Sequence, residues 1–183
     1  MISLMFLTNS LTNLMGNNMK FEKVSFKQWK KDAIKLWSFD DDKLLEIYND
    51  IKLPKQGTTS SMGMDFFIPY DLTLCGSKAE IIPTGIRWVV NKADGNVGLI
   101  IVPRSGLGFK YGIRLENTVG VIDADYQFAD NEGHIMIKLR NSQNILVELE
   151  QGKAFAQGII LPYQICDGAE SDENRTGGFG STG

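Results

Sequence analysis

The segment VGLIIVPRSG, residues 97–106, passes from an uncharged, mostly apolar run directly into proline, arginine and glycine. An apolar run of this length that ends in turn residues is typical of a buried strand. The same pattern recurs on both sides of it, in DFFIPYDLTL, EIIPTGIRWVV, HIMIKLR, ILVELE and FAQGIILPYQ. Short strands at this spacing predict an all-β sandwich or barrel with long connections.

A small helical insertion is predicted near the start of the chain, at about residues 26–51. KFEKVSF, residues 20–26, alternates as a strand does, and Ser25 with Gln28 forms a capping-box pattern that opens a helix. One face of this helix would carry Phe26, Trp29, Ala33 and Trp37. A second helix would begin at Asp40, Asp41 and Asp42, present Leu44, Leu45, Tyr48 and Ile51 as its apolar stripe, and end before Pro54.

Length and composition predict one main domain. The chain has 183 residues, of which 43% are hydrophobic and 22% are charged, which is enough to bury one core. We place the domain at residues 19–166. Residues 1–18, which are polar and rich in asparagine after a short apolar start, are expected to be disordered. Residues 167–183 begin with an acidic, linker-like stretch and are expected to form a flexible C-terminal arm.

Charge and cysteine spacing exclude several classes of protein. A formal net charge of −3 gives no general attraction to nucleic acid or anionic membranes, and no stretch reaches a membrane-spanning length. Cys75 and Cys166 lie far apart and, with the single histidine His134, form no metal-binding pattern. We therefore expect a soluble, cytoplasmic protein with reduced, partly buried thiols and no metal held directly by protein side chains.

Two segments carry candidate chemistry. In PRSGLGFKYGI, residues 103–113, the guanidinium of Arg104, a hydroxyl and backbone N–H groups could contact a phosphate together. Alone, this segment would also fit a strand-end turn. In ENTVGVIDADYQ, residues 116–127, Asp123 could be a general base and Tyr126 could offer its ring to a sugar or a base. The alternative is a turn with a capping aspartate and a core tyrosine.

Taken together, five segments resemble the motifs of the trimeric dUTPase (dUTP diphosphatase) family, across roughly residues 53–183. In chain order they are SSMGMDFF, PRSGLGFKYGI, NTVGVIDADYQ, QGKAFAQ and RTGGFGSTG. The resemblance implies a jelly-roll-like β subunit and a homotrimer with shared active sites. It also implies hydrolysis of dUTP to dUMP and pyrophosphate by a water molecule that attacks the α-phosphate.

The resemblance assigns a role to each matched residue. Asp123 would activate the water, and Asp65 would support the phosphate region. Uracil and deoxyribose would be bound by Asn117, Gly120, Val121, Ile122, Tyr126, Met136 and Phe179. The phosphates would be bound by Arg104, Ser105, Gly106, Gln157, Arg175, Gly178, Ser181 and Thr182. Mg²⁺ would be carried by the triphosphate oxygens, and the C-terminal arm would close over nucleotide bound on neighbouring subunits.

Some segments depart from the family pattern. Tyr70-Asp71-Leu72 imitates the first motif but follows proline, so Asp65 is the matching residue and Asp71 is interpreted as an ordinary exposed carboxylate. FADNE, residues 128–132, is inserted after the third motif. The residues that differ within or beside motifs are Met62, Met64 and Phe155.

The helical insertion lies outside the family pattern, and it would be either a packing appendage or a surface for an unknown protein partner. As a segment outside the motifs, it is expected to tolerate change, as is FADNE. His134 is expected to be structural. The tryptophans Trp29, Trp37 and Trp88 are expected to be core or helix-face residues.

Two other functions stay open at this point. The first is that of a deoxycytidine triphosphate deaminase, the sister enzyme on the same fold, although no deaminase pattern replaces NTVGVIDADYQ. The second is that of a dUTP-binding regulatory or interaction protein without catalysis. The presence of Asp123, Arg104, Arg175 and Phe179 favours the hydrolase.

Overall fold

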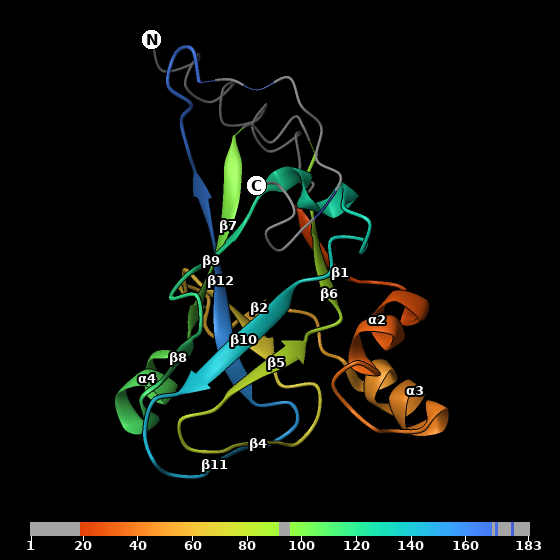
Figure 1. Ribbon diagram of the computed structural model, residues 1–183. Coiled ribbons are helices and arrows are strands. Elements are labelled where there is room, and N and C mark those ends of the chain that lie inside the picture. The colour runs from red at the N-terminus through yellow and green to blue at the C-terminus, as the bar shows by residue number, and fades with distance from the viewer. Residues whose placement is uncertain (1–18, 92–95, 170, 172–176, 178–183) are drawn as a thin grey trace.

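The computed structural model describes residues 19–91, 96–169, 171 and 177. Strands dominate these residues, which confirms the all-β prediction (Figure 1). The strands are β1 (Lys20–Lys23), β2 (Lys55–Gln56), β3 (Met64–Phe67), β4 (Leu72–Leu74), β5 (Ala79–Pro83), β6 (Ile86–Val89), β7 (Val97–Pro103), β8 (Ile113–Leu115), β9 (Gly120–Ile122), β10 (Met136–Asn141), β11 (Val147–Leu149) and β12 (Ala154–Pro162). The helices are α2 (Phe26–Ala33), α3 (Asp41–Asp50), α4 (Ser105–Tyr111) and the 3₁₀-helix η2 (Ala124–Phe128). The segment 1–18, predicted to be disordered, lies outside the described residues.

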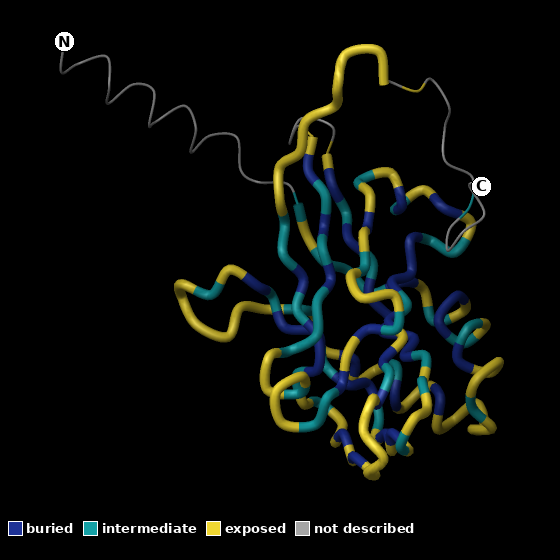
Figure 2. Tube along the Cα trace, turned by 60° about the vertical axis from the view of Figure 1, so that its left-hand side comes forward, coloured by how far each residue is buried: buried dark blue, intermediate teal, exposed yellow. Residues whose placement is uncertain are grey.

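The largest sheet is built around β12. Its strand order is β2-β3-β12-β7-β9, and β12 pairs antiparallel with β7 from Ala156 opposite Pro103 to Pro162 opposite Val97. The smaller sheets have the orders β5-β10-β8, β1-β6 and β11-β4. Strand β7 alternates as a strand with one core face should, with Val97, Leu99 and Ile101 buried. Figure 2 shows the buried residues gathered in the centre of the molecule.

Both predicted helices are present, and they pack on the β core. The side chain of Trp29 is completely buried, and its indole Nε1 donates to the carbonyl of Pro83 at 3.0 Å. Trp37 contacts Tyr70 with ring centroids 4.0 Å apart. Leu44 of α3 is buried in the same hydrophobic core as the strands. The helical insertion is therefore joined to the domain core, and Figure 1 shows it on the side of the molecule next to β5 and β6.

The predicted apolar stripe of α3 is wrong at one residue, Leu45. Leu45 is 44% exposed, whereas Ile47, which was not assigned to the stripe, is buried. Because α3 begins at Asp41, its inner face is defined by the spacing of Leu44, Ile47 and Ile51, and Leu45 points about 100° away from Leu44.

The helix start at Ser25 combines a predicted and an unpredicted contact. The Ser25 hydroxyl accepts from the backbone N–H of Gln28 at 3.1 Å, as the capping-box pattern predicts. The reciprocal acceptor is not Gln28, whose side chain donates to Asp32. It is Glu132, which accepts from the backbone N–H of Ser25 at 2.7 Å and from its hydroxyl at 2.6 Å. The FADNE insertion thus completes the cap of α2.

Helix α4 was not predicted, because it contains Gly106 and Gly108, and glycine is a poor helix former. It begins after Arg104 and ends at Gly112, whose φ of 62° is the left-handed conformation favoured by glycine at a helix end. None of its residues is buried, and Phe109 is 96% exposed.

The prediction of partly buried thiols is also wrong. Cys75 and Cys166 are both free and exposed. Cys75 directly follows the last residue of β4, and Cys166 lies four residues after the end of β12. Within the described residues, no helix is long and apolar enough to cross a membrane.

The burial of the helical insertion predicts that it unfolds together with the β core. Substitution Trp29→Ala should lower the free energy of unfolding by about 3–5 kcal/mol, because it removes a large buried side chain. Ile34→Ala, at an exposed position next to α2, should change it by less than about 0.5 kcal/mol. Urea titrations followed by far-UV circular dichroism would measure both values. A separate, earlier transition for the helices in the unsubstituted protein would contradict one shared core.

Candidate active site

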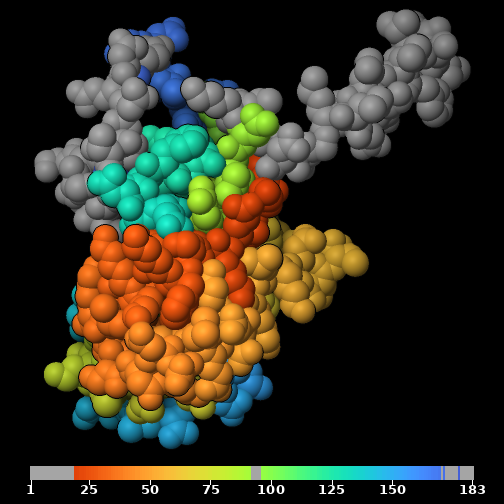
Figure 3. Space-filling view, turned by 90° about the vertical axis from the view of Figure 1, so that its right-hand side faces the viewer, coloured from red at the N-terminus to blue at the C-terminus, as the bar shows by residue number. Residues whose placement is uncertain are grey.

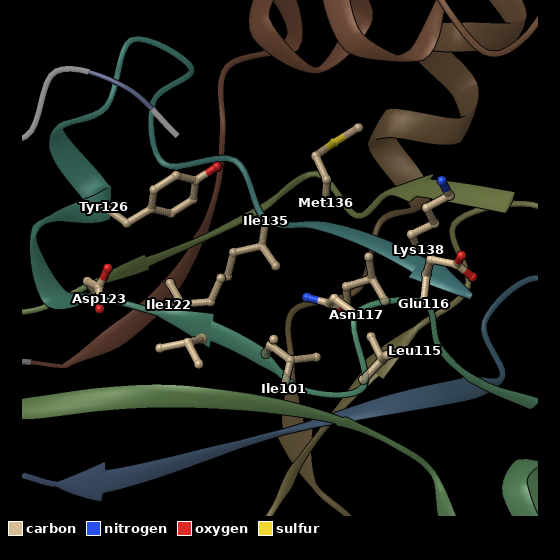
Figure 4. A pocket seen from close by; sticks show the side chains of 13 residues that line it. Ile101, Leu115, Glu116, Asn117, Ile122, Asp123, Tyr126, Ile135, Met136 and Lys138 are labelled. Carbon is tan, nitrogen blue, oxygen red and sulfur yellow. The ribbon is translucent and has the colours of Figure 1, made fainter. Parts of the chain in front are cut away.

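A pocket of about 610 Å³ opens beside strands β9 and β10 (Figure 4). Apolar side chains form most of its wall, and a few polar groups stand at its ends, as is typical of sites for small organic ligands. Figure 4 shows Asp123 and Tyr126 at one end, with Asn117, Glu116 and Lys138 toward the other. The lining residues are Ile101, Leu115, Glu116, Asn117, Gly120, Val121, Ile122, Asp123, Tyr126, Ile135, Met136, Ile137 and Lys138.

The pocket brings together most of the residues predicted to bind uracil and deoxyribose. Asn117, the segment from Gly120 to Ile122, Asp123, Tyr126 and Met136 all line it. Sequence reasoning missed the other apolar wall residues, and it also missed the charged residues Glu116 and Lys138. The guanidinium of Arg140 donates to the carboxylate of Glu116 and lowers the pKa of that carboxyl.

Asp123 is positioned by the end of a strand. Strand β9 pairs with β7, with Ile122 opposite Leu99, and the chain leaves the sheet at Asp123 to form η2. Asp123 thus lies in a turn that leads into η2, directly before its first residue. Asp123 lines the pocket and Asp125 does not.

Tyr126 lies in η2 and is 5% exposed, yet its ring faces the pocket (Figure 4). Its hydroxyl donates to the carbonyl of His134 at 2.9 Å and accepts from the side-chain amide of Asn131 at 2.7 Å. His134 is fully buried and hydrogen-bonded, as expected of a structural histidine. The ring of Tyr126 is therefore held at its polar end by the protein.

A second cluster joins the first, second and fourth motifs. Asp65 on β3 accepts from the guanidinium Nη1 of Arg104 at 2.6 Å and from the amide of Gln157 at 3.0 Å. Asp65 and Gln157 stand opposite each other in the register of β3 and β12. The carboxylate is buried, whereas the Arg104 side chain keeps 40% of its surface exposed. Asp71, by contrast, is exposed and accepts from the backbone N–H of Gln151, in agreement with its interpretation.

These two groups do not meet within one chain. Ile122 is opposite Leu99 on β7, so Asp123 lies level with Gly98, six residues before Arg104 on that strand. At about 3.3 Å per residue, Arg104 and Asp123 are separated by about 20 Å along the sheet. Ser105 and Gly106 lie at the start of α4, beside Arg104. The remaining predicted phosphate residues, Arg175, Gly178, Ser181 and Thr182, and the uracil-stacking Phe179, lie outside the described residues.

Comparison with known proteins shows the family of the chain. The dUTPase family model matches residues 49–183. The chain belongs to the dUTPase family. A deoxyuridine 5'-triphosphate nucleotidohydrolase of Lactococcus lactis is 39% identical over 136 residues, covering 73% of this chain and 89% of the relative. Another, of Paraburkholderia xenovorans, is 38% identical over 150 residues, covering 78% of this chain and 97% of the relative.

A solved dUTPase structure from Streptococcus mutans has a TM-score of 0.61 and 27% identity, and it covers 81% of this chain and 99% of that one. This likeness confirms the jelly-roll-like fold expected of a dUTPase. The family match begins at residue 49, so α2 and most of α3 lie outside it, as predicted. Among the described residues, no group of three His, Cys, Asp or Glu side chains could hold a metal ion.

The close packing of the pocket wall predicts that glycine is preferred at position 120. A Cβ at Gly120 would lie 3.1 Å from the Cβ of Ile101, which is fixed in strand β7. Gly120→Ala should therefore lower the free energy of unfolding by about 1–3 kcal/mol through overpacking. Gly106→Ala, where a Cβ would meet nothing within 4 Å, should be neutral or stabilising. Urea titration measures both, and equal stability of the two variants would contradict the close contact.

Proposed function

We propose that this chain hydrolyses dUTP to dUMP and pyrophosphate in the cytoplasm, with Asp123 as the general base. The observation that carries the proposal is the pocket itself, in which the Asp123 carboxylate stands beside the ring of Tyr126 at one end of an apolar wall. Membership of the dUTPase family and the names of its relatives supply the substrate.

Different residues of the pocket would bind different parts of the nucleotide. The amide of Asn117 and the backbone of residues 120–122 would form hydrogen bonds with the polar edge of uracil, and Met136 would pack on the face of the base. Tyr126 would pack against the deoxyribose and leave no room for a 2′-hydroxyl group. In a ribonucleotide, the 2′-hydroxyl group would clash with the Tyr126 ring and would lose its hydrogen bonds to water.

The chemical step then requires one proton transfer. Asp123 takes a proton from a water molecule as the water oxygen bonds to the α-phosphorus. The bond from that phosphorus to the oxygen bridging the α- and β-phosphates breaks, and pyrophosphate leaves with the electron pair. Positioning and charge stabilisation, more than covalent help, make such transfers fast.

The phosphates would be bound by Arg104, Ser105, Gly106 and Gln157 of a neighbouring subunit. The separation of about 20 Å between Arg104 and Asp123 along one chain supports this arrangement. So does the outer face of the large sheet, where Ile159, Ile100 and Val121 form a row across three paired strands. Val121 is 63% exposed in the single chain, and such a row is suited to contact with another subunit. We therefore infer a homotrimer with shared active sites.

Mg²⁺ would be bound through the triphosphate oxygens, where it neutralises negative charge. Asp65 already accepts hydrogen bonds from Arg104 and Gln157, so its carboxylate is suited to holding the phosphate-binding groups in place. The arm residues Arg175, Gly178, Phe179, Ser181 and Thr182 would complete the site by closing over the bound nucleotide.

Pyrophosphate release from dUTP, dCTP, dTTP and UTP tests the function. We expect efficient turnover of dUTP alone, with UTP rejected strongly because Tyr126 packs on the sugar. Ammonia release from dCTP would instead identify a deaminase, and binding of dUTP without turnover would identify a regulatory protein. Comparable kcat/KM for dUTP and UTP would contradict the assigned role of Tyr126.

Asp123→Asn should separate chemistry from binding. The substitution keeps the size of the side chain but removes the proton acceptor, so dUTP should still bind while kcat falls roughly 10²- to 10⁴-fold.

Deletion of residues 174–183 should leave a folded trimer with a much lower kcat/KM. Trimers assembled from the two inactive chains should regain part of the activity, because some sites then hold Asp123 and an arm from different subunits. No recovery in verified mixed trimers would refute shared sites.

A further inference from the structure

The chain's single histidine connects the helical insertion to the nucleotide pocket. His134 is fully buried between α2 and the turn from β5 to β6. Its Nε2 accepts from the backbone N–H of Gly85 at 2.9 Å, and its Nδ1 lies 2.9 Å from the carboxylate Oδ2 of Asp32. Since Nε2 is the acceptor, the proton of the neutral ring is on Nδ1, and it is donated to Asp32.

The backbone carbonyl of His134 bonds to a residue that lines the pocket. The carbonyl of His134 accepts from the hydroxyl of Tyr126 at 2.9 Å and from the amide of Asn131 at 3.3 Å. The next two residues, Ile135 and Met136, line the pocket directly. The contacts of the His134 ring therefore fix the residue whose carbonyl holds the polar end of Tyr126.

Asp32 is itself fixed on helix α2. It accepts from the side-chain amide of Gln28 at 2.7 Å and from Lys35 at 3.1 Å. Burial would raise the pKa of Asp32, but the hydrogen bonds from His134, Gln28 and Lys35 outweigh it and hold that pKa well below its usual value. The carboxylate is therefore charged at neutral pH.

A second contact keeps α2 against the loop that carries His134. Glu132 accepts from both the backbone N–H and the hydroxyl of Ser25, at the N-terminus of α2. Figure 3 shows the α2 region (orange) directly against the teal segment that contains this loop. Helix, histidine and tyrosine thus form one continuous set of hydrogen bonds from the insertion to the pocket.

We propose that Asp32 and His134 are positioning residues for Tyr126, so that helix α2 sets how strictly the pocket excludes a 2′-hydroxyl group. The proposal rests on the proposed function, and it departs from the expectation that the insertion is a separable appendage. An aromatic ring can exclude the 2′-hydroxyl group of a ribonucleotide only if the ring keeps its position when that group approaches. The Tyr126 ring keeps its position because its hydroxyl is bonded to the fixed carbonyl of His134. Without this hydrogen bond the ring would move more easily and exclude the 2′-hydroxyl group less strictly.

The kinetic test compares the ratio of kcat/KM for dUTP to that for UTP among variants. Asp32→Ala removes the acceptor of His134 Nδ1–H and should lower the ratio about tenfold, mainly through faster turnover of UTP relative to dUTP. Asp32→Asn keeps an oxygen that can accept this proton and should restore most of the ratio. Lys35→Ala removes only the exposed partner of the other carboxylate oxygen, Oδ1. Since Gln28 still bonds the Oδ2 that faces His134, the ratio should stay unchanged.

A control of stability is needed because Asp32→Ala also weakens the fold. Leu44→Ala, in the buried face of α3, should destabilise the protein by about 2–5 kcal/mol without touching the Asp32–His134 pair. If Leu44→Ala lowers the ratio as much as Asp32→Ala does, the pair is merely structural and the proposal fails. An unchanged ratio in Asp32→Ala also overturns it.

Nuclear magnetic resonance of the imidazole nitrogens gives a readout that does not depend on turnover. With a single histidine in the chain, ¹⁵N-histidine labelling yields one ring spectrum. We expect the Nδ1–H tautomer in the unsubstituted protein, a shift of the ring nitrogens when dUMP binds, and a mixture of tautomers in Asp32→Ala. The Nε2–H tautomer, or ring nitrogens indifferent to dUMP that is shown to bind, would refute the proposal.

Failure of the proposed function looks different from failure of this inference. It would appear in the unsubstituted protein, as absent dUTP turnover or as equal use of dUTP and UTP. The inference alone fails when the unsubstituted protein discriminates between dUTP and UTP and any of the contradicting outcomes named above is found, such as equal discrimination by Asp32→Ala.

Discussion

The antiparallel pairing of β7 with β12 is the contact on which the rest of the structure depends. Its seven-residue register runs from Pro103 to Val97 and fixes where each neighbouring strand can lie. On one side, β12 aligns Gln157 with Asp65, and the turn after β7 brings Arg104 to the same carboxylate. On the other side, β7 aligns Leu99 with Ile122 and thereby places Asp123 at the opposite end of the sheet. One register thus separates the groups suited to phosphate from the group suited to proton transfer.

Much of this could be predicted from sequence, because the deciding signals are local. Short apolar runs cut by glycine and proline predicted the strands, and Ser25 and Asp40 predicted the helix starts that the structure confirms. The choice of Asp65 over Asp71 agrees with their surroundings, since only Asp65 contacts Arg104. The pocket contains the described residues assigned to base and sugar, although their roles stay predictions.

The misses concern features that the local sequence pattern does not show. Helix α4 contradicts the low helix propensity of its glycines, and its exposed surface provides no apolar stripe to recognise. The exposure of Cys75 and Cys166 depends on where strands end. The contact between Asp32 and His134 joins residues 102 positions apart, so no periodicity could have indicated it. A lone buried histidine is recognisable as structural, but its partner is not.

The cap that Glu132 gives to helix α2 has a consequence for how such a chain could be recombined. Most of the helical insertion precedes the matched family region, whereas FADNE lies within it, and the two segments meet where Glu132 accepts hydrogen bonds from Ser25. In a relative with the helices alone, the exposed N–H of Ser25 would bond to water instead of Glu132. In a relative with FADNE alone, water would take the place of Ser25 at the Glu132 carboxylate. A chimera that divides the two segments would therefore lose the contact that joins the start of α2 to the loop before β10.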